Sequence, residues 1–489
     1  MNGHFVAGHF VAGEKRAANR NPADSNDNTL GEFASDGMAH LATALDAAQK
    51  AFHSWKKTPG PERGRVLIKA AQWARAHKEE IARDLTLEEG KTLGESRGEV
   101  EKGICVMEFC GGEAFRLGGA VVPSEMRSTL AYVTRAPLGV VSLITPWNFP
   151  WAIPAWKSAP ALAAGNACIL KPASLTPRTA LWLAKAYQEG GLPDGLFNVL
   201  LGRGGELGEA LVKAEQVRAV SFTGSTEIGR ELAALASRSL KKVSAEMGGK
   251  NAVVVFDDAD LDLAATGIIQ GAFGSSGQRC TATSRVIATS RALPKLLERL
   301  EAQAKAQIVG PGIDAKSTMG PAVDEKQMET DLRYIGIAKE EGAKLVTGGK
   351  RMQEGALARG FFVEPTIFSG VKRDTRIARE EVFGPVLAVI EAASEEEAVS
   401  IANDTPFGLS ASLYTSDVTR SMHFIDDIDV GIVHINSPTV GGEPQMPFGG
   451  TKGTGLGTRE MGRSGVEFFT EEKAVYIDYT GQKRTVSFY

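Results

Sequence analysis

Cys280 is the side chain of this sequence whose surroundings point most directly to chemistry. It ends the segment Phe273-Gly-Ser-Ser-Gly-Gln-Arg-Cys280, so a thiol lies in a glycine- and serine-rich loop beside the cation of Arg279. Inert cysteines are normally flanked by the apolar residues of a strand or helix. Reactive thiols need partial exposure and nearby positive charge that favours the thiolate. This loop therefore predicts a nucleophile, with a small loop-filling residue as the alternative.

A carboxylate upstream is suited to assist such a nucleophile. Glu246 lies in Val243-Ser-Ala-Glu-Met-Gly-Gly-Lys-Asn251, at the end of what we interpret as a charged helical stretch, and a buried-looking strand follows at Ala252–Phe256. Burial can raise the pKa of a glutamate toward neutrality, where it acts as a general base. The pair Cys280 and Glu246 is thus typical of a covalent mechanism with an acid–base step.

Composition indicates a large enzyme and excludes several other classes. The 489 residues exceed what one core usually covers, and 43% of them are hydrophobic. The net charge of −4 comes from 55 basic and 59 acidic residues, so no basic surface for nucleic acid is expected. No apolar run reaches the roughly 18 residues of a membrane span, and no secretion signal is evident. Four cysteines without metal-ligand spacing indicate a reduced cytoplasmic protein without a metal site.

The elements that must position these residues follow from periodicity. From Asp36 to about Gly112 apolar residues recur at helical spacing. From about Pro137 short apolar runs alternate with helix-like segments, which predicts parallel sheets covered on both faces and ligands at the carboxyl ends of the strands. The expected strands are 139–144, 167–170, 197–201, 219–222, 252–255, 284–288, 386–390 and 431–435. The fold class is therefore α/β, with two doubly wound domains.

Five segments together resemble the NAD(P)-dependent aldehyde dehydrogenase superfamily. Each is moderately specific alone, but all occur in the family's order, and the resemblance covers nearly the whole chain. They are Thr145-Pro-Trp-Asn-Phe-Pro150, Phe222-Thr-Gly-Ser225, Glu246-Met-Gly-Gly-Lys-Asn251, Gly277-Gln-Arg-Cys280 and Glu380-Glu-Val-Phe-Gly-Pro-Val386.

The resemblance implies a division of the chain. It assigns 1–119 and 140–247, with 451–467, to a cofactor-binding domain and 248–450 to a catalytic domain. Segments 120–139 and 468–489 would form a small oligomerisation sheet, which implies a homodimer or homotetramer. An ordinary edge hairpin is the alternative for that sheet.

The resemblance also implies how the reaction runs. Cys280 attacks an aldehyde, Asn148 with the Cys280 backbone N–H stabilises the oxyanion, and hydride leaves for NAD or NADP. Glu246 then activates water to hydrolyse the thioester. Because acyl-CoA-forming relatives usually lack this glutamate, its presence favours a free carboxylic acid as the product. Intact Cys280, Glu246 and Asn148 argue against a non-catalytic relative.

The cofactor site has one clear local signal and several residues implied by the resemblance. Phe222-Thr223-Gly224-Ser225 follows a strand and opens a helix, so free amides and the Ser225 hydroxyl would face the pyrophosphate. A serine-capped helix is the alternative. Gly202-Arg-Gly-Gly-Glu-Leu-Gly208 is a weaker phosphate-binding signal. The further residues expected at the cofactor are Thr145, Pro146, Trp147, Lys171, Ser174, Arg203, Gly204, Gly205, Glu381 and Phe383, with Lys171 also counted among the catalytic residues.

Ser174 sets the expected cofactor preference. Many NAD-preferring relatives carry a glutamate at this position, which repels a 2′-phosphate. Here Lys171 supplies positive charge and Arg203 is suited to a bidentate contact. An exposed arginine is often only solvated. We expect NADP to be accepted, with NAD as the other cofactor.

The sequence indicates less about the substrate than about the reaction. Phe109-Cys-Gly-Gly-Glu-Ala114, Gln278-Arg-Cys-Thr-Ala282 and Phe468-Phe-Thr470 resemble α-ketoglutaric semialdehyde and succinate-semialdehyde dehydrogenases. The first of these segments suggests a widened entrance, and Arg279 is a candidate cation for a carboxylated substrate. Glu443 resembles a feature of aromatic-aldehyde enzymes and would repel an anion if it lined the pocket.

One repeat remains. His4-Phe-Val-Ala-Gly8 recurs at once as His9-Phe-Val-Ala-Gly13. It is too short for a solenoid, and we interpret it as a frayed extension before the edge strand or an accident of the gene, without function.

Overall fold

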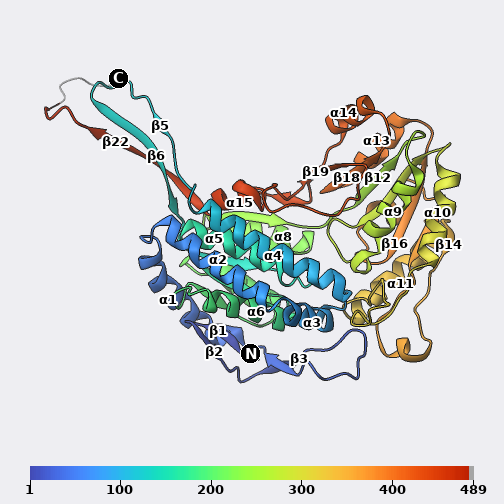
Figure 1. Cartoon of the computed structure of the whole chain (residues 1–489), viewed down its shortest axis with the longest axis horizontal. Helices are drawn as coiled ribbons and strands as arrows, with labels where there is room; N and C mark the ends of the chain where they lie inside the picture. The colour runs from blue at the N-terminus through green and yellow to red at the C-terminus, as the bar shows by residue number, and fades with distance from the viewer. Residues whose placement is uncertain (484–489) are drawn as a thin grey trace.

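The computed structural model describes residues 1–483, so 484–489 of the expected oligomerisation segment lie outside the described residues. Two parallel sheets, each covered by helices, make up the body, and a long ribbon of strands projects from it (Figure 1). This confirms the α/β class with two wound sheets and a separate small sheet. No helix among the described residues is long and apolar enough to cross a membrane.

The first sheet has a parallel centre of five strands. Its apolar runs are buried on both faces, which is why they read as continuous hydrophobic stretches. In spatial order the strands are β2 (His9–Val11), β1 (His4–Val6), β9 (Phe197–Val199), β8 (Ala167–Lys171), β7 (Val140–Ile144), β10 (Val217–Thr223), β11 (Lys242–Glu246) and β21 (Gly455–Leu456). Strand β11 corrects our helical reading of the stretch before Glu246, because its residues 242–246 pair in parallel with 219–223 of β10.

Helices cover this sheet in two layers. Those against the strands are α1 (Gly37–Trp55), α5 (Ala152–Ala164), α6 (Pro177–Glu189), α7 (Gly204–Lys213) and α8 (Thr226–Ser237). The remaining four are α2 (Gly60–Ala76), α3 (Lys78–Glu89), α4 (Leu93–Glu113) and α15 (Gly462–Phe468). The helical periodicity expected from Asp36 to Gly112 is confirmed by α1 to α4. Helix α4 begins with a capping box, in which Thr92 and Glu95 satisfy each other's backbone amides.

The second sheet has seven strands. Their order is β14 (Lys344–Thr347), β15 (Thr366–Ser369), β16 (Val386–Ala392), β13 (Thr283–Thr289), β12 (Asn251–Val255), β18 (Ser410–Tyr414) and β19 (Ile432–Ile435). Its helices are α9 (Leu261–Phe273), α10 (Leu293–Lys305), α11 (Glu325–Glu340), α12 (Arg376–Arg379), α13 (Glu395–Asn403) and α14 (Val418–Asp427), with the 3₁₀ segments η1 (Gly274–Gly277) and η2 (Gly355–Arg359). The sequence analysis did not predict strands β14, β15 and β18.

The projecting ribbon, here called the arm, is a three-stranded antiparallel sheet. It consists of β5 (Val121–Val122), β6 (Thr129–Pro137) and β22 (Thr470–Asp478), and β6 pairs with β22 along its full length. Two short ribbons complete the strands: β3 (Arg16–Ala18) with β4 (Glu32–Ala34), and β17 (Phe407–Gly408) with β20 (Thr451–Lys452).

The N-terminal repeat is part of the fold, and our reading of it as a frayed extension was wrong. The two copies pair with each other as β1 and β2, and β1 also joins β9 at the edge of the first sheet. In the first copy His4, Phe5 and Val6 are buried, whereas in the second copy His9 is exposed and Phe10 and Val11 are half-buried. The same five residues thus have two environments, because β1 lies between β2 and β9 in the sheet, whereas β2 is the edge strand.

Candidate functional site

Cys280 lies in the loop between η1 and β13. Two serines of η1, Ser275 and Ser276, have φ values of 49° and 55°, which is strained backbone for residues with a side chain. The strain is held by contacts to other elements: Ser276 Oγ donates to the Gly320 carbonyl at 2.7 Å, and Val323 N–H donates to Gln278 Oε1 at 2.9 Å. This loop fixes the half-buried thiol at a cavity between the two sheets.

The charge around the thiol differs from our expectation. Burial, together with the nearby carboxyl groups of Glu381 and Glu246, raises the pKa of Cys280 to about 12. Arg279 does not offset them, because its guanidinium is turned to Ser275 Oγ at 2.9 Å and Glu95 at 3.3 Å. The free protein therefore holds a neutral thiol, and the expected thiolate-stabilising cation beside Cys280 is absent among the described residues.

Asn148 reaches the same loop from the first sheet. It lies between β7 and α5, is buried, and donates from Nδ2 to the Gln278 carbonyl at 3.1 Å. The backbone carbonyl of Asn148 accepts from Lys91 Nζ at 2.6 Å. The amide side chain is thus brought beside the residues that precede Cys280, as an oxyanion donor requires.

Lys91 and Glu99 support Asn148 and were missed by the sequence analysis. Both are buried and joined at 2.7 Å, and Glu99 also accepts from the backbone N–H of Trp151 and Ala152 at the start of α5. Lys91 Nζ lies 4.0 Å from the centre of the Phe149 ring. In a sequence these two charges look like surface residues of a helix, and only their mutual burial marks them as supports of the 148–152 turn.

Glu246 ends β11, close enough to Cys280 for its carboxyl group to raise the pKa of the thiol. It is buried, its Oε2 has no hydrogen-bond partner, and Gly449 packs so closely against the carboxyl that a side chain there would clash. Burial raises its pKa well above the usual range; Glu460 adds to this, while Arg459 and Lys157 act against it. A carboxyl with a raised pKa is suited to gain and lose a proton near neutral pH.

A buried ion pair lies behind Glu246. Lys157 of α5 pairs with Glu460 and donates to Ser221 Oγ at 2.8 Å, and Trp156 Nε1 donates to Glu460 at 2.8 Å. These groups were not found from the sequence, because the residues come from segments about 300 positions apart.

Glu381 and Phe383 form a rigid corner next to the Cys280 loop. Glu381 Oε1 accepts from Gly249 N–H at 2.9 Å, and burial raises its pKa to about 7. Phe383 has a φ of 65°, and its ring meets Trp147 edge-on with centres 5.5 Å apart. One expected cofactor residue from beyond the end of β7, Trp147, is thereby brought against the 381–383 loop, which carries two others, Glu381 and Phe383.

The carboxyl ends of β7, β8 and β10 present unpaired polar atoms. The hydroxyls of Thr145 and Thr223 are buried without partners, and Lys171 is buried, which lowers its pKa to about 8. Ser225 precedes α8, and its hydroxyl makes no capping bond to the helix. Gly224 N–H donates to the Glu246 carbonyl at 3.1 Å, and a Cβ on Gly224 would lie 2.6 Å from the Phe222 ring. Free donors at one sheet edge fit the phosphates and ribose of a dinucleotide.

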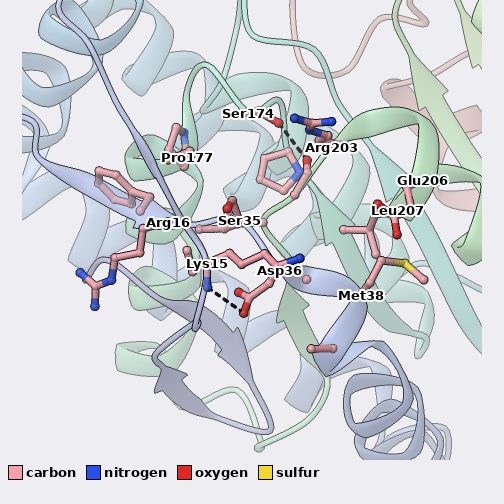
Figure 2. Close-up of a pocket in the computed structure, with 18 of the residues that line it drawn as sticks. Lys15, Arg16, Ser35, Asp36, Met38, Ser174, Pro177, Arg203, Glu206 and Leu207 are labelled. Carbon is pink, nitrogen blue, oxygen red and sulfur yellow. Dashed lines mark hydrogen bonds between the residues drawn. The ribbon is translucent and has the colours of Figure 1, made fainter.

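The turns after β8 and β9 meet at this edge. Ser174 Oγ donates to the Gly202 carbonyl at 2.8 Å, and the exposed Arg203 precedes α7 (Figure 2). Gly204 is so close to Lys171 that an added Cβ would lie 3.4 Å from its Nζ, and Gly205 is open, with nothing within 4 Å. Pro146 lies half-buried after Thr145. Ser174 and Arg203 also border a cavity of about 930 Å³ that extends to Lys15 and Asp36.

The cavity in front of Cys280, here called the Cys280 cavity, has a volume of about 330 Å³. Its apolar lining comprises Phe149, Ile153, Trp156, Val440, Phe448 and Met461, and its charged lining Glu95, Glu99, Lys102 and Arg279. The 109–114 segment does not line it, so our reading of that segment as a widened entrance was wrong. The residues of α4 that line the cavity lie earlier on the helix and are Glu95, Gly98, Glu99 and Lys102. Glu443 is not in the lining either, although Gly441 and Gly442 are.

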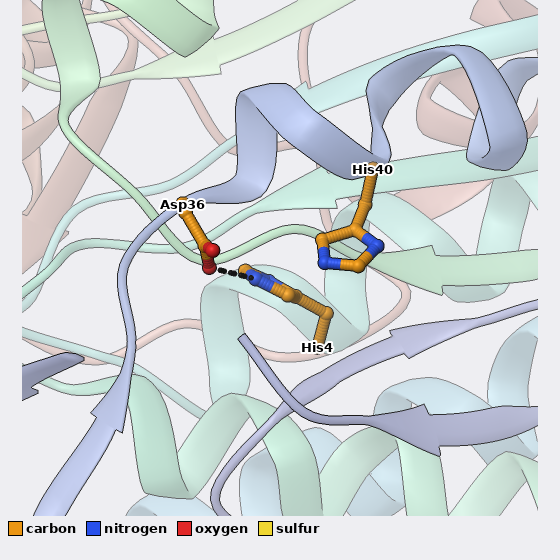
Figure 3. A group of neighbouring side chains, drawn as sticks. All are labelled: His4, Asp36 and His40. Carbon is orange, nitrogen blue, oxygen red and sulfur yellow. Dashed lines mark hydrogen bonds and ion pairs between the residues drawn. The ribbon is translucent and has the colours of Figure 1, made fainter. Parts of the chain in front are cut away.

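A second cluster of potential ligands lies at the N-terminus. The side chains of His4, Asp36 and His40 have ligand atoms within 4.8 Å of one another (Figure 3). Leu201 N–H donates to His4 Nδ1 at 3.1 Å, so the proton of the neutral ring is on Nε2, which contacts Asp36 at 2.9 Å. That tautomer has no free lone pair for a metal. The cluster therefore ties β1 to α1, and we assign it a structural role.

Comparison with known proteins agrees with this geometry. The sequence model of the aldehyde dehydrogenase family matches residues 10–475. The chain belongs to the aldehyde dehydrogenase family. It is thus an oxidoreductase that acts on aldehydes, as the five motifs led us to expect.

Two similar proteins share most of their length with this enzyme. It is 44% identical to the α-ketoglutaric semialdehyde dehydrogenase of Bacillus subtilis over 457 residues, 94% of this chain and 93% of the relative. It is 42% identical to the 2,5-dioxopentanoate dehydrogenase of Saccharolobus solfataricus over 459 residues, 93% of this chain and 95% of the relative. Among solved structures, the betaine aldehyde dehydrogenase of Staphylococcus aureus in complex with NAD⁺ superposes with a TM-score of 0.96 at 32% identity, covering 99% of this chain and 96% of that one.

Proposed function

We propose that this enzyme oxidises a carboxylated semialdehyde, such as α-ketoglutaric semialdehyde, to the free acid with NAD or NADP as cofactor. The observation that carries the proposal is the proximity of Asn148 and Glu246 to Cys280: Asn148 Nδ2 donates to the Gln278 carbonyl of the Cys280 loop, and the Glu246 carboxyl raises the pKa of the thiol. The aldehydes named for the two similar dehydrogenases support the substrate class.

In the first half-reaction Cys280 acts as the nucleophile. Its sulfur bonds to the aldehyde carbon, the thiol proton passes to a base, and the carbonyl oxygen becomes an oxyanion. Asn148 Nδ2 and the Cys280 N–H donate to that oxygen, and one such donor typically contributes about 3 kcal/mol to the transition state. Since the pKa of the thiol is about 12 in the free enzyme, its deprotonation is slow there, and the base that takes the proton is solvent water.

The cofactor would supply the acceptor for a hydride, which is the oxidation itself. The residues that we propose to hold it are the unpaired donors at the ends of β7, β8 and β10, with Glu381 and Phe383 at the nicotinamide side and Lys171 and Ser174 at the adenosine ribose. When the hydride leaves the tetrahedral carbon, the C=O bond re-forms and Cys280 carries a thioester.

In the second half-reaction Glu246 acts as a general base. It takes a proton from water, the water oxygen bonds to the thioester carbon, and the Cys280 sulfur leaves as the carboxylic acid forms. The unpaired Oε2 and the raised pKa of Glu246 suit this step. Hydrolysis rather than transfer to coenzyme A is therefore the proposed outcome.

The arm supports a homo-oligomer. Its surface exposes apolar side chains, among them Val121, Tyr476 and Ile477, which are 77%, 66% and 46% exposed. Such a patch on a projecting sheet is typical of an interface. We propose that a second copy of the chain covers it, giving a homodimer or homotetramer, and that the enzyme works in the cytoplasm, where its four free thiols stay reduced.

A second candidate function is oxidation of aromatic or varied aldehydes, because most of the Cys280 cavity is apolar. A panel of purified substrates distinguishes the two. We would measure kcat/KM for succinic semialdehyde, 2,5-dioxopentanoate, butanal and benzaldehyde, each with NAD⁺ and NADP⁺, with and without coenzyme A, and with Cys280→Ala as the inactive control.

The expected result is a preference for the two carboxylated aldehydes and a free acid as product. A preference for benzaldehyde would establish the second candidate. Oxidation of no aldehyde, or activity surviving in Cys280→Ala, would overturn the proposed reaction.

A further inference from the structure

The charged side chains that line the Cys280 cavity differ in whether they have an ionic partner. Glu99 is buried and satisfied by Lys91 and two backbone amides. Arg279 is paired with Glu95, and two of its nitrogens also donate to Ser275 Oγ at 2.9 and 3.1 Å. These charges therefore nearly cancel, and the Arg279 guanidinium is already engaged on one side of the cavity.

Lys102 is the exception. It makes no ion pair within residues 1–483, and its Nζ donates to the Gly442 carbonyl. The groups that raise its pKa are the Cys105 thiol and the exposed Glu443, whose side chain accepts from Gln445. Burial outweighs this and lowers the pKa of Lys102 to about 8. A half-buried ammonium without a counter-ion is costly unless an anion comes to it.

The surroundings of Lys102 leave room for such an anion. One turn earlier on α4, Gly98 also lines the cavity, and a Cβ there would meet nothing within 4 Å. On the opposite side, Gly441 and Gly442 likewise have open space where a side chain would start. The lysine thus lies between two bare stretches of backbone, at the same cavity as the Cys280 sulfur.

We propose that Lys102 is the carboxylate-binding residue of this enzyme, reading the acid end of an aldehyde whose other end meets Cys280. This rests on the proposed oxidation of carboxylated semialdehydes and names the cation that selects them. The substrate carboxylate accepts from Nζ in place of the Gly442 carbonyl, and Arg279 stays with Glu95 and Ser275.

The test compares an anionic with a neutral aldehyde of equal chain length. We would measure kcat/KM for succinic semialdehyde and butanal with wild type and Lys102→Met, which keeps the length of the side chain and removes its charge. A charge-assisted hydrogen bond contributes enough for the ratio of the two values to fall about ten- to a hundredfold. Lys69→Met, an exposed lysine on α2, is the matched control for the loss of one charge and should keep the wild-type ratio.

Two further variants sharpen the assignment. Lys102→Glu should shift preference toward betaine aldehyde, which carries a positive charge, and away from succinic semialdehyde. A wild-type ratio in Lys102→Met, or an equal loss on both aldehydes, would overturn the proposal. So would loss of the ratio in Arg279→Gln alone, since that would make Arg279 the carboxylate reader. If wild type showed no preference for succinic semialdehyde over butanal, the proposed function would fail first; if it showed that preference and Lys102→Met kept it, only the Lys102 assignment would fall.

Discussion

At the residue scale, the Cys280 thiol and the Glu246 carboxyl both keep their protons to a higher pH than the same groups do in water. Burial raises the pKa of Cys280 and of Glu246, and the carboxyl groups of Glu381 and Glu246 also raise the pKa of the thiol. The free enzyme is therefore a resting state, in which a reactive thiolate is rare and protected from chance oxidation. Charge must enter with the ligands before the thiol becomes a good nucleophile.

The resting state predicts how Cys280 reacts with an alkylating agent. With a pKa of about 12, the rate of its modification by iodoacetamide in the free enzyme should rise about tenfold per pH unit between pH 7 and 10. Mass spectrometry of digested protein would follow Cys280 and, as an internal comparison, the other half-buried thiol, Cys105. A rate that levels off near pH 7 would contradict a neutral resting thiol.

Glu246→Gln should separate the two half-reactions. The amide keeps the shape of the side chain but cannot take a proton, so thioester hydrolysis should slow by about a hundredfold or more. Stopped-flow measurement should show a burst of reduced cofactor followed by a slow steady state. In wild type the steady-state rate should rise with pH through the raised pKa of Glu246, hence above the usual carboxyl range.

An equal loss of burst and steady state in Glu246→Gln would have a different meaning. It would assign this carboxylate to deprotonation of Cys280 rather than to hydrolysis. The conservative variant Glu246→Asp shortens the side chain but keeps the base, and should recover part of the steady-state rate.

At the scale of elements, the site is assembled where strand ends, helix starts and one long helix meet. The ends of β7, β8 and β10 supply unpaired donors, while α4 supplies Glu99 and Lys102. We propose that the turn after β8 and the start of α7 decide the cofactor preference, because Ser174 and Arg203 lie on them (Figure 2). A change at Ser174 should therefore affect selectivity more than catalysis.

Ser174→Glu should penalise NADP⁺ selectively. A carboxylate at this exposed turn would repel a 2′-phosphate, and like charges in a partly shielded site correspond to about ten- to a hundredfold in kcat/KM. Arg203→Ala should weaken NADP⁺ and spare NAD⁺. Steady-state kinetics with both cofactors would check this. Should wild type strongly prefer NAD⁺, or Ser174→Glu affect both cofactors alike, the proposed place of the 2′-phosphate is wrong.

At the scale of the whole molecule, the arm is the part that the body does not need for its own core. It extends away from both sheets (Figure 1). Its strands carry exposed aromatic and aliphatic side chains. A sheet of this shape gains stability when another surface covers it, which is why we propose a partner copy.

The double variant Tyr476→Asp with Ile477→Lys should weaken that assembly. Charged side chains at these two exposed positions would be desolvated in an interface, so the mass found by light scattering should fall toward that of a monomer. Val418→Asp on α14 is a matched control, because Val418 is 75% exposed but lies away from the arm. A monomeric wild type, or an unchanged mass in the double variant, would rule out the arm as the interface.

The sequence by itself determined the family, the two wound sheets and the identity of Cys280, Asn148 and Glu246 as the residues to test. These inferences depend on short-range features: apolar runs that are buried on both faces, glycines at turns, and motifs in a fixed order. They are properties of neighbouring residues, so they can be recognised without knowledge of the fold.

The tertiary structure alone decided the rest. Strand β11 looked helical because its pairing with β10 is set by residues outside its own segment. The two identical copies of the N-terminal pentapeptide differ in their environment because only the first copy pairs with β9. Lys157 and Lys102 carry no local sign that they are buried or half-buried, since their partners Glu460 and Gly442 come from distant segments. Likewise, the pKa of Cys280 depends on Glu381 and Glu246, and Arg279, its neighbour in sequence, is turned to Glu95.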